Sequence, residues 1–143
     1  MKICFLDGST IPYTSNDLNS KNIRGGENAI IHLSNELSKL GNNIEVYNSF
    51  KDICVINGVK WSSICHANKN LTYDIAFTNN DIKLFDKIIA KKYVAFSHSI
   101  QSIEKFIRKG QLFSYLKYKP KIVLLGKYHK ENRNYLLKLF GTI

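Results

Sequence analysis

The stretch N-I-R-G-G-E-N-A-I-I-H-L-S-N-E-L-S-K-L-G-N-N-I-E-V-Y, Asn22–Tyr47, predicts a loop, a helix and a strand in succession. Its apolar residues recur at helical spacing and define one face of the helix. Gly41 stands where a helix end needs a residue that tolerates positive φ, and the next strand starts near Ile44. The stretch therefore predicts an amphipathic helix on a sheet. The expected apolar face comprises Ala29, Ile30, Leu33, Leu37 and Leu40.

Apolar runs alternate with helical patterns along the rest of the chain. Asp52–Cys65 reads as two short strands joined by Asn57-Gly58, which is typical of a β-hairpin. Strands that alternate with helices predict an α/β fold with an open, mainly parallel sheet and helices on both faces. Buried strands are expected at Ile3–Leu6, Tyr73–Thr78, Lys92–Ser97 and Lys121–Leu125, and helices at Ile82–Ala90, Gln101–Tyr118 and Tyr128–Phe140.

Length and composition favour one globular domain. The 143 residues suffice for a single core, and the apolar fraction of 44% is ordinary for such a domain. No apolar run is long enough to cross a membrane, and the apolar part of the N-terminus is too short for a signal peptide. Three cysteines without a C-x-x-C spacing favour buried free thiols in a reducing cytosol over a disulfide or metal site.

The net charge of +10 is unevenly distributed along the chain. Residues 1–82 carry 7 Lys/Arg against 8 Asp/Glu, whereas residues 83–143 carry 14 against 3. A basic half implies an anionic partner or a well-solvated surface. The candidate partners are nucleic acid, anionic lipid headgroups and a phosphorylated ligand.

The start of the first helix is a candidate anion site. Gly25 and Gly26 leave the backbone bare where a helix N-terminus offers free N–H groups, although a glycine pair also serves as a simple turn. Arg24 could clamp a phosphate, or it could be solvated. Glu27 suits the helix dipole, and a catalytic carboxylate is the second interpretation of this residue.

Other candidate residues follow the strands of the predicted sheet. Asp7 and Ser9 end the first strand, and His98 ends the strand that closes with Val94-Ala95-Phe96-Ser97. The carboxyl ends of parallel strands share one edge, where open α/β sheets bind ligands. We therefore expect Asp7, Ser9 and His98 near Gly25 and Gly26. His98 could donate to a phosphate or a sugar hydroxyl there, or it could be a capping or packing histidine.

The order of these features resembles the start of a family 4 (group 1) glycosyltransferase of the GT-B fold. The resemblance lies in a first strand, the loop Gly25-Gly26-Glu27, a leucine-bearing helix and the run Gly41–Val46, which follows a G-x-x-[VI]-x-V pattern. Asn42 departs from the usual histidine, and Glu27 follows the glycines directly. The resemblance implies that residues 1–143 are one Rossmann-like N-terminal domain, half of a GT-B fold, without the C-terminal donor-binding domain.

The resemblance also implies an activity. Such enzymes are retaining, hexosyltransferase-type glycosyltransferases that move a sugar from a nucleotide-diphosphate sugar to a sugar or lipid-linked acceptor, with no metal and no cofactor besides the donor substrate. His98 would face the transfer cleft as the catalytic residue, and Arg24, Gly25, Gly26 and Glu27 would meet the donor diphosphate. Asp7 and Ser9 would form the cleft edge, and a role in the turn after the first strand fits these two residues equally well. The chain alone would be inactive, and a C-terminal domain in the same or another chain would be its partner.

The segment Lys105–Lys121 mixes basic and large apolar residues. This pattern favours contact with an anionic membrane, and thus a cytoplasmic protein that is peripheral on the inner membrane face. An RNA-contacting face and an ordinary core helix with solvated lysines fit the same pattern. The cations concerned are Lys105, Arg108, Lys109, Lys117, Lys119 and Lys121.

A second function also fits the sequence. A non-enzymatic, doubly wound binding module could use the basic half to hold nucleic acid or a protein partner. The reading frame downstream of residue 143 distinguishes the two hypotheses, because a GT-B enzyme continues into a second domain with paired glutamates. The donor sugar, the acceptor and the oligomeric state leave no mark in this sequence.

Overall fold

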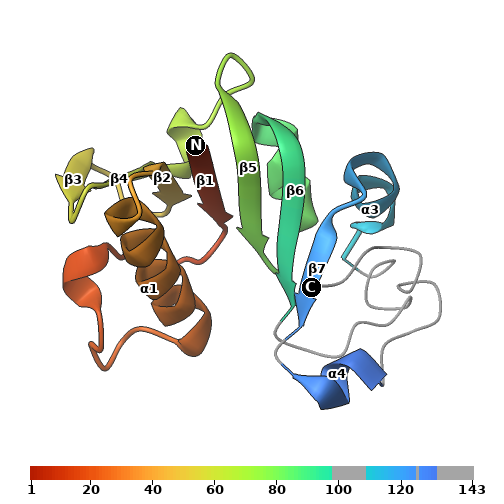
Figure 1. Cartoon of the computed structure of the whole chain (residues 1–143), viewed down its shortest axis with the longest axis horizontal. Coiled ribbons are helices and arrows are strands. Elements are labelled where there is room, and N and C mark those ends of the chain that lie inside the picture. Colours follow the sequence, from red (N-terminus) through yellow and green to blue (C-terminus); the bar gives the residue numbers. More distant parts are fainter. Residues whose placement is uncertain (98–108, 125, 132–143) are drawn as a thin grey trace.

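The computed structural model describes residues 1–97, 109–124 and 126–131, and it shows an α/β fold around one open sheet (Figure 1). The seven strands run in the order β3-β4-β2-β1-β5-β6-β7, and each neighbouring pair is parallel except β3 with β4. The Rossmann-like fold class is thus confirmed. The strands are β1 (Lys2–Asp7), β2 (Asn43–Asn48), β3 (Cys54–Ile56), β4 (Val59–Ser63), β5 (Thr72–Asn79), β6 (Ile89–Ser97) and β7 (Lys121–Leu124).

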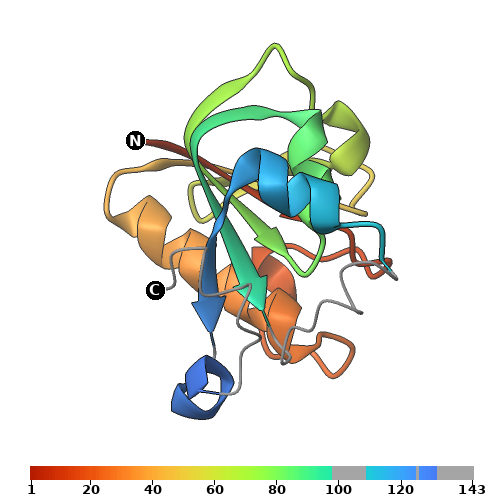
Figure 2. The same cartoon turned by 90° about the vertical axis from the view of Figure 1, so that its right-hand side faces the viewer.

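Helical segments lie on both faces of this sheet. Figure 2 shows α1 on one side of the strands and α3 reaching over the other side. Right-handed crossovers explain this division, because α1 links β1 to a strand on one side and the later connections lead to strands on the other. The segments are η1 (Ser15–Asp17), α1 (Gly25–Lys39), η2 (Ile64–His66), η3 (Ile82–Lys87), α3 (Leu112–Tyr118) and α4 (Lys127–Glu131), where η denotes a 3₁₀ helix.

Two apolar layers hold the sheet between these segments. Side chains of β1 alternate, so that Ile3 and Phe5 join the layer under α1, whereas Cys4 and Leu6 join the opposite layer. The rings of Phe5 and Phe77 stack across neighbouring strands with centroids 4.8 Å apart. Alternate packing on both faces explains why the central strands read as continuous apolar runs.

The buried face of α1 agrees with the predicted one at Ile30, Leu33 and Leu37, which pack against the core, and differs from it at Ala29 and Leu40. Ile30 and Ile31 are buried together with Ser34, whereas Ala29 is exposed and Leu40 is 77% exposed. Leu40 is the C-cap residue, and the chain turns away from the helix through Gly41 at φ 79°. The predicted helix end is therefore confirmed, but the predicted contact of Leu40 with the core is wrong.

The hairpin prediction is confirmed, and several element boundaries change. Asn57 and Gly58 both have positive φ, 54° and 74°, as a two-residue hairpin turn requires. The expected helix Ile82–Ala90 is instead a shorter 3₁₀ helix, because residues from Ile89 onward pair with β5 and extend β6. Of the expected helix Gln101–Tyr118, residues 101–108 lie outside the described residues, residues 109 and 110 form a turn in which Gly110 has φ 61°, and only Leu112–Tyr118 is helical. Of the expected helix Tyr128–Phe140, the structure describes residues 128–131, which belong to α4 (Lys127–Glu131).

Candidate functional site

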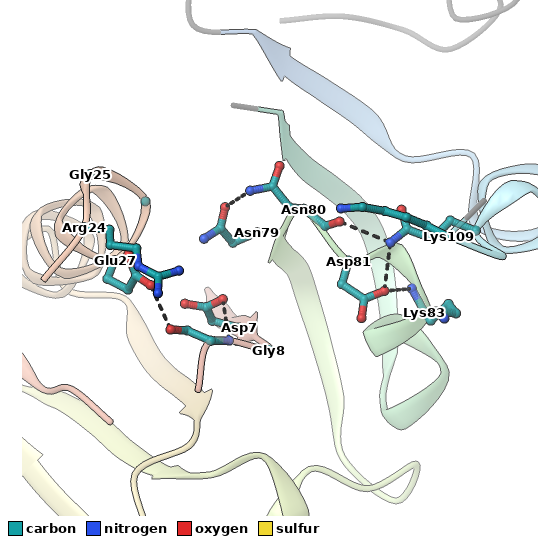
Figure 3. Close-up of a pocket in the computed structure, with 13 residues that line it drawn as sticks. Asp7, Gly8, Arg24, Gly25, Glu27, Asn79, Asn80, Asp81, Lys83 and Lys109 are labelled. Carbon is teal, nitrogen blue, oxygen red and sulfur yellow. Dashed lines mark hydrogen bonds between the residues drawn. The ribbon is translucent and has the colours of Figure 1, made fainter. Parts of the chain in front are cut away.

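A cavity of about 700 Å³ opens at the carboxyl ends of β1 and β5 (Figure 3). One wall comes from the end of β1 and the first turn of α1, and the other from residues after β5 and before α3. This is the edge where the sequence places Asp7, Ser9, Arg24, Gly25, Gly26 and Glu27, and all six line the cavity. Their predicted proximity is confirmed, while their chemical roles stay predictions.

Asp7 forms the floor on the β1 side. It is only 3% exposed, and its carboxylate accepts hydrogen bonds from the Tyr13 hydroxyl at 2.7 Å and the Ser9 backbone N–H at 3.2 Å. Burial raises the pKa of Asp7 above its ordinary value, although the bonds from Tyr13 and Ser9 oppose the shift. A buried carboxyl group with a raised pKa can exchange a proton with a ligand or accept a hydrogen bond from a sugar hydroxyl.

Glu27 lies beside Asp7 in the first turn of α1. It is 4% exposed, and its Oε1 accepts a hydrogen bond from the Ser9 hydroxyl at 2.7 Å. Ser9 therefore connects the two carboxylates, because its N–H bonds one and its Oγ bonds the other. The position at the helix N-terminus favours the negative charge of Glu27. The structure thus gives Glu27 a partner that its place in the sequence did not reveal.

The N-terminus of α1 opens onto the cavity. Arg24 is the N-cap residue, and its side chain makes no capping hydrogen bond. Figure 3 shows the Arg24 side chain extending from α1 toward the cavity. The first N–H groups of α1 have no partner within the helix, so Gly25 and Gly26 present donors and bare backbone at the same wall.

The opposite wall was not predicted as part of the site. Asn79 ends β5, and Asp81 caps η3 through the Lys83 N–H at 3.1 Å. The buried Gln111 donates from Nε2 to the Asn80 carbonyl and to Asp81 Oδ1, both at 3.2 Å, and so joins the start of α3 to the end of β5. Asn79-Asn80-Asp81 was the available signal, because polar residues that follow a buried parallel strand lie at the same edge of the sheet as Asp7.

The acidic and basic side chains of the cavity differ in whether they have hydrogen-bond partners. Asp7, Glu27 and Asp81 each accept at least one hydrogen bond from the protein. Within the described part of the chain, the side chains of the three cavity cations have neither a hydrogen bond nor an ion pair. These cations are Arg24, Lys83 and Lys109. The charge that remains available to a ligand is therefore positive.

Three of the predicted functional residues lie outside the described residues. They are His98, Lys105 and Arg108, so the predicted contact of His98 with the glycine loop stays a prediction. Ser97, the residue before His98, is buried at the carboxyl end of β6. No group of side chains suited to a metal ion occurs among residues 1–97, 109–124 and 126–131.

The basic and aromatic segment divides between core and surface. Tyr115 is buried, and Tyr118 packs edge-to-face on Phe85 at 5.6 Å between ring centroids. Phe113 and Leu116 instead point outward, with 83% and 55% of their surface exposed. Lys109, Lys119 and Lys121 are also exposed, and Lys117 pairs with Asp86 at 2.5 Å. Among the described residues, the structure has no helix of the length and apolarity that a membrane crossing needs.

Fold and cavity together define a Rossmann-like α/β fold with a polar cavity at the carboxyl edge of its sheet. Comparison with family models, curated proteins and solved structures finds no match. The functional argument therefore rests on the cavity and on the sequence pattern.

Proposed function

We propose that this chain is the N-terminal, acceptor-side domain of a GT-B glycosyltransferase. One observation carries the proposal: the cavity joins two buried, Ser9-linked carboxylates to the glycine-rich N-terminus of α1. Carboxylates suit sugar hydroxyls, and a helix N-terminus with a free arginine suits a diphosphate. The order of elements around Gly25-Gly26-Glu27 supports the same class by resemblance.

In this proposal, each group has a distinct role. Arg24, Gly25 and Gly26 meet the diphosphate of a nucleotide-sugar donor, while Asp7 and Glu27 orient the acceptor hydroxyl. His98 acts as the catalytic residue of the transfer cleft. The reaction retains the anomeric configuration and uses the nucleotide sugar without a further cofactor. A C-terminal domain, in the same or another chain, binds the nucleotide, and the chain alone does not turn over.

The downstream gene sequence and a transfer assay test the proposal. We expect the frame to continue into a domain with paired glutamates, and the whole product to transfer a labelled sugar from one of a panel of nucleotide sugars. His98→Ala and Asp7→Asn should each lower kcat far more than stability, and His66→Ala, at the exposed end of η2, serves as the control. Absence of transfer with every donor would favour the alternative, a non-enzymatic module that uses its basic face to hold an anionic partner.

We also propose that the protein binds peripherally to an anionic membrane surface, with Phe113 and Leu116 as apolar anchors. Exposed aromatic and aliphatic side chains beside lysines suit a headgroup layer, which contributes roughly 1 kcal/mol per nearby cation. Co-sedimentation with anionic vesicles should fall for Phe113→Ala with Leu116→Ala. The matched control is Ile53→Ala with Val55→Ala, two exposed apolar residues around β3 at the other edge of the sheet. Equal loss in both pairs would contradict the assignment.

A further inference from the structure

Three cations line the cavity, and they lie on two different walls. The cation at the α1 wall is Arg24, next to the glycine pair. Lys83 on η3 and Lys109 before α3 belong to the opposite wall. Figure 3 shows Arg24 and Lys109 reaching toward the cavity from opposite sides, with Asn79 between them. The positive charge therefore occupies two separate places rather than one.

The carboxylates that line the cavity disfavour an anion beside them. Asp7 at the end of β1 and Glu27 in the first turn of α1 are both buried. A phosphate placed beside them would meet like charge, whereas a hydroxyl group would find an acceptor. The cavity thus presents an anion-binding wall at α1, a hydroxyl-binding floor, and a second anion-binding wall at η3 and α3.

The wall that carries Lys83 and Lys109, here called the lysine wall, is held in place by hydrogen bonds from Gln111. Gln111 hydrogen-bonds both the Asn80 carbonyl and Asp81, which fixes the chain beside Lys109 to the chain beside Lys83. Asp81 is occupied by the Lys83 N–H and by Gln111, and it forms no ion pair with either lysine among the described residues. Among the described residues, both ammonium groups are therefore without a partner and can meet a ligand.

We infer that the acceptor of this domain is itself anionic, a sugar or polyol that carries a phosphate group, with the phosphate bound by Lys83 and Lys109 and the hydroxyl groups bound over Asp7 and Glu27. This inference rests on the proposed function, because it assigns the α1 wall to the donor. A cavity of about 700 Å³ is within the usual range for small-molecule sites and has room for a phosphorylated hexose. The phosphate can belong to a soluble sugar or to a lipid headgroup.

Binding to the purified chain tests the inference without any transfer. The probes are glucose 6-phosphate, glucose and inorganic pyrophosphate, measured by calorimetry at low salt. We expect glucose 6-phosphate to bind at least tenfold more tightly than glucose. Lys83→Ala with Lys109→Ala should weaken the binding of glucose 6-phosphate at least tenfold and the binding of pyrophosphate less than twofold. Arg24→Ala should instead weaken the binding of pyrophosphate at least tenfold and that of glucose 6-phosphate less than twofold. Lys51→Ala with Lys87→Ala removes the same charge from exposed positions outside the cavity and should change neither.

Two results would overturn the inference. Equal weakening of both probes by both variants would show a single anion site, and equal binding of glucose and glucose 6-phosphate would show a neutral acceptor. Vesicles with and without phosphatidylinositol separate the two sources of phosphate, because only a lipid acceptor makes vesicle binding depend on Lys83 and Lys109. If transfer fails with every donor while the lysine-dependent binding persists, the proposed glycosyltransferase function is wrong, but the assignment of a phosphorylated ligand to Lys83 and Lys109 is retained.

Discussion

Two buried carboxylates in this domain sit in contrasting surroundings. Asp7, in the cavity, accepts hydrogen bonds from a tyrosine hydroxyl and a backbone N–H, with a further contribution from the Asn79 side chain, but burial still raises its pKa. Glu45, on β2, accepts from the hydroxyls of Tyr47 and Tyr73, the latter at 2.7 Å. Burial alone would raise the pKa of Glu45, but the two tyrosines, with Lys60 and Lys2 nearby, hold it below its ordinary value.

The comparison separates a structural carboxylate from one that is available for chemistry. The hydrogen-bond donors and cations around Glu45 offset the energetic cost of burying its charge. The ionised carboxylate therefore stabilises the folded state. Asp7 has no cation that bonds it among the described residues and lies at the wall of a cavity. Its charge is therefore incompletely compensated, which is the condition under which a ligand proton or hydroxyl is taken up.

The largest expected effect is the loss of Glu45. Glu45→Leu should destabilise the domain by about 3 kcal/mol, because two buried hydroxyls lose their shared carboxylate acceptor and retain only each other. Urea unfolding at neutral pH measures this difference. Asp7→Asn should change stability by less than about 1 kcal/mol, since losing an acceptor oxygen is offset by losing a poorly compensated charge. A larger cost for Asp7→Asn than for Glu45→Leu would reverse the comparison.

The second-largest expected effect is the removal of the Tyr13 hydroxyl, the tyrosine donor to Asp7. Tyr13→Phe should cost about 1.5 kcal/mol and raise the pKa of Asp7 further, because the Tyr13 hydroxyl is the side-chain donor that opposes the burial effect most. Carboxyl NMR titration and urea unfolding follow the two quantities. Tyr47→Phe provides the control, since Glu45 then retains Tyr73. An unchanged Asp7 titration in Tyr13→Phe would contradict this assignment.

Acid titration of stability should separate the two carboxylates by sign. The contribution of Glu45 is present above its unfolded pKa of about 4.3 and is lost as the pH falls through its lower folded value. Asp7 acts oppositely: stability is lost as the pH rises from about 3.9 through its raised folded pKa. Unfolding free energies of the wild type, Glu45→Gln and Asp7→Asn between acid and neutral pH measure both slopes. Slopes of the same sign would refute the distinction.

The smallest effect concerns the cation beside Glu45. Lys2 Nζ lies 3.8 Å from Glu45 Oε1, and its side chain is 35% exposed. Lys2→Gln should cost only about 0.5 kcal/mol, and the cost should vanish at high salt, because water and ions screen an exposed pair. Urea midpoints at two salt concentrations provide the measurement. A cost that survives high salt would give Lys2 a larger share in the compensation of Glu45.

The sequence predicted best what depends on local pattern. The strands were found because burial on two faces produces continuous apolar runs, and the hairpin because Asn57-Gly58 accepts positive φ. One wall of the cavity was found for a similar reason. Asp7 and Ser9 follow a strand, and Gly25 opens a helix, so parallel topology alone brings them to one edge.

Features that depend on distant contacts were missed. Asn35 is buried on α1 because its Oδ1 accepts from the Ser15 hydroxyl at 2.6 Å, and no helical pattern reveals that partner. The lysine wall requires Gln111 to meet Asp81, two residues whose contact follows from the placement of α3. A sequence pattern reports which residues share a face of one element, but not which face a neighbouring element covers.

The strand order also determines when the domain can assemble. β1 is central, and its partner β5 lies far along the chain: the Thr78 hydroxyl bonds the Leu6 carbonyl across 72 residues. A chain emerging from the ribosome therefore keeps one edge of its central strand unpaired until β5 has been synthesised. Long-range parallel pairing is slow because closing a large loop must precede the contacts that stabilise it. Nascent chains that end before Asn79 consequently lack the strand that completes the centre of the sheet.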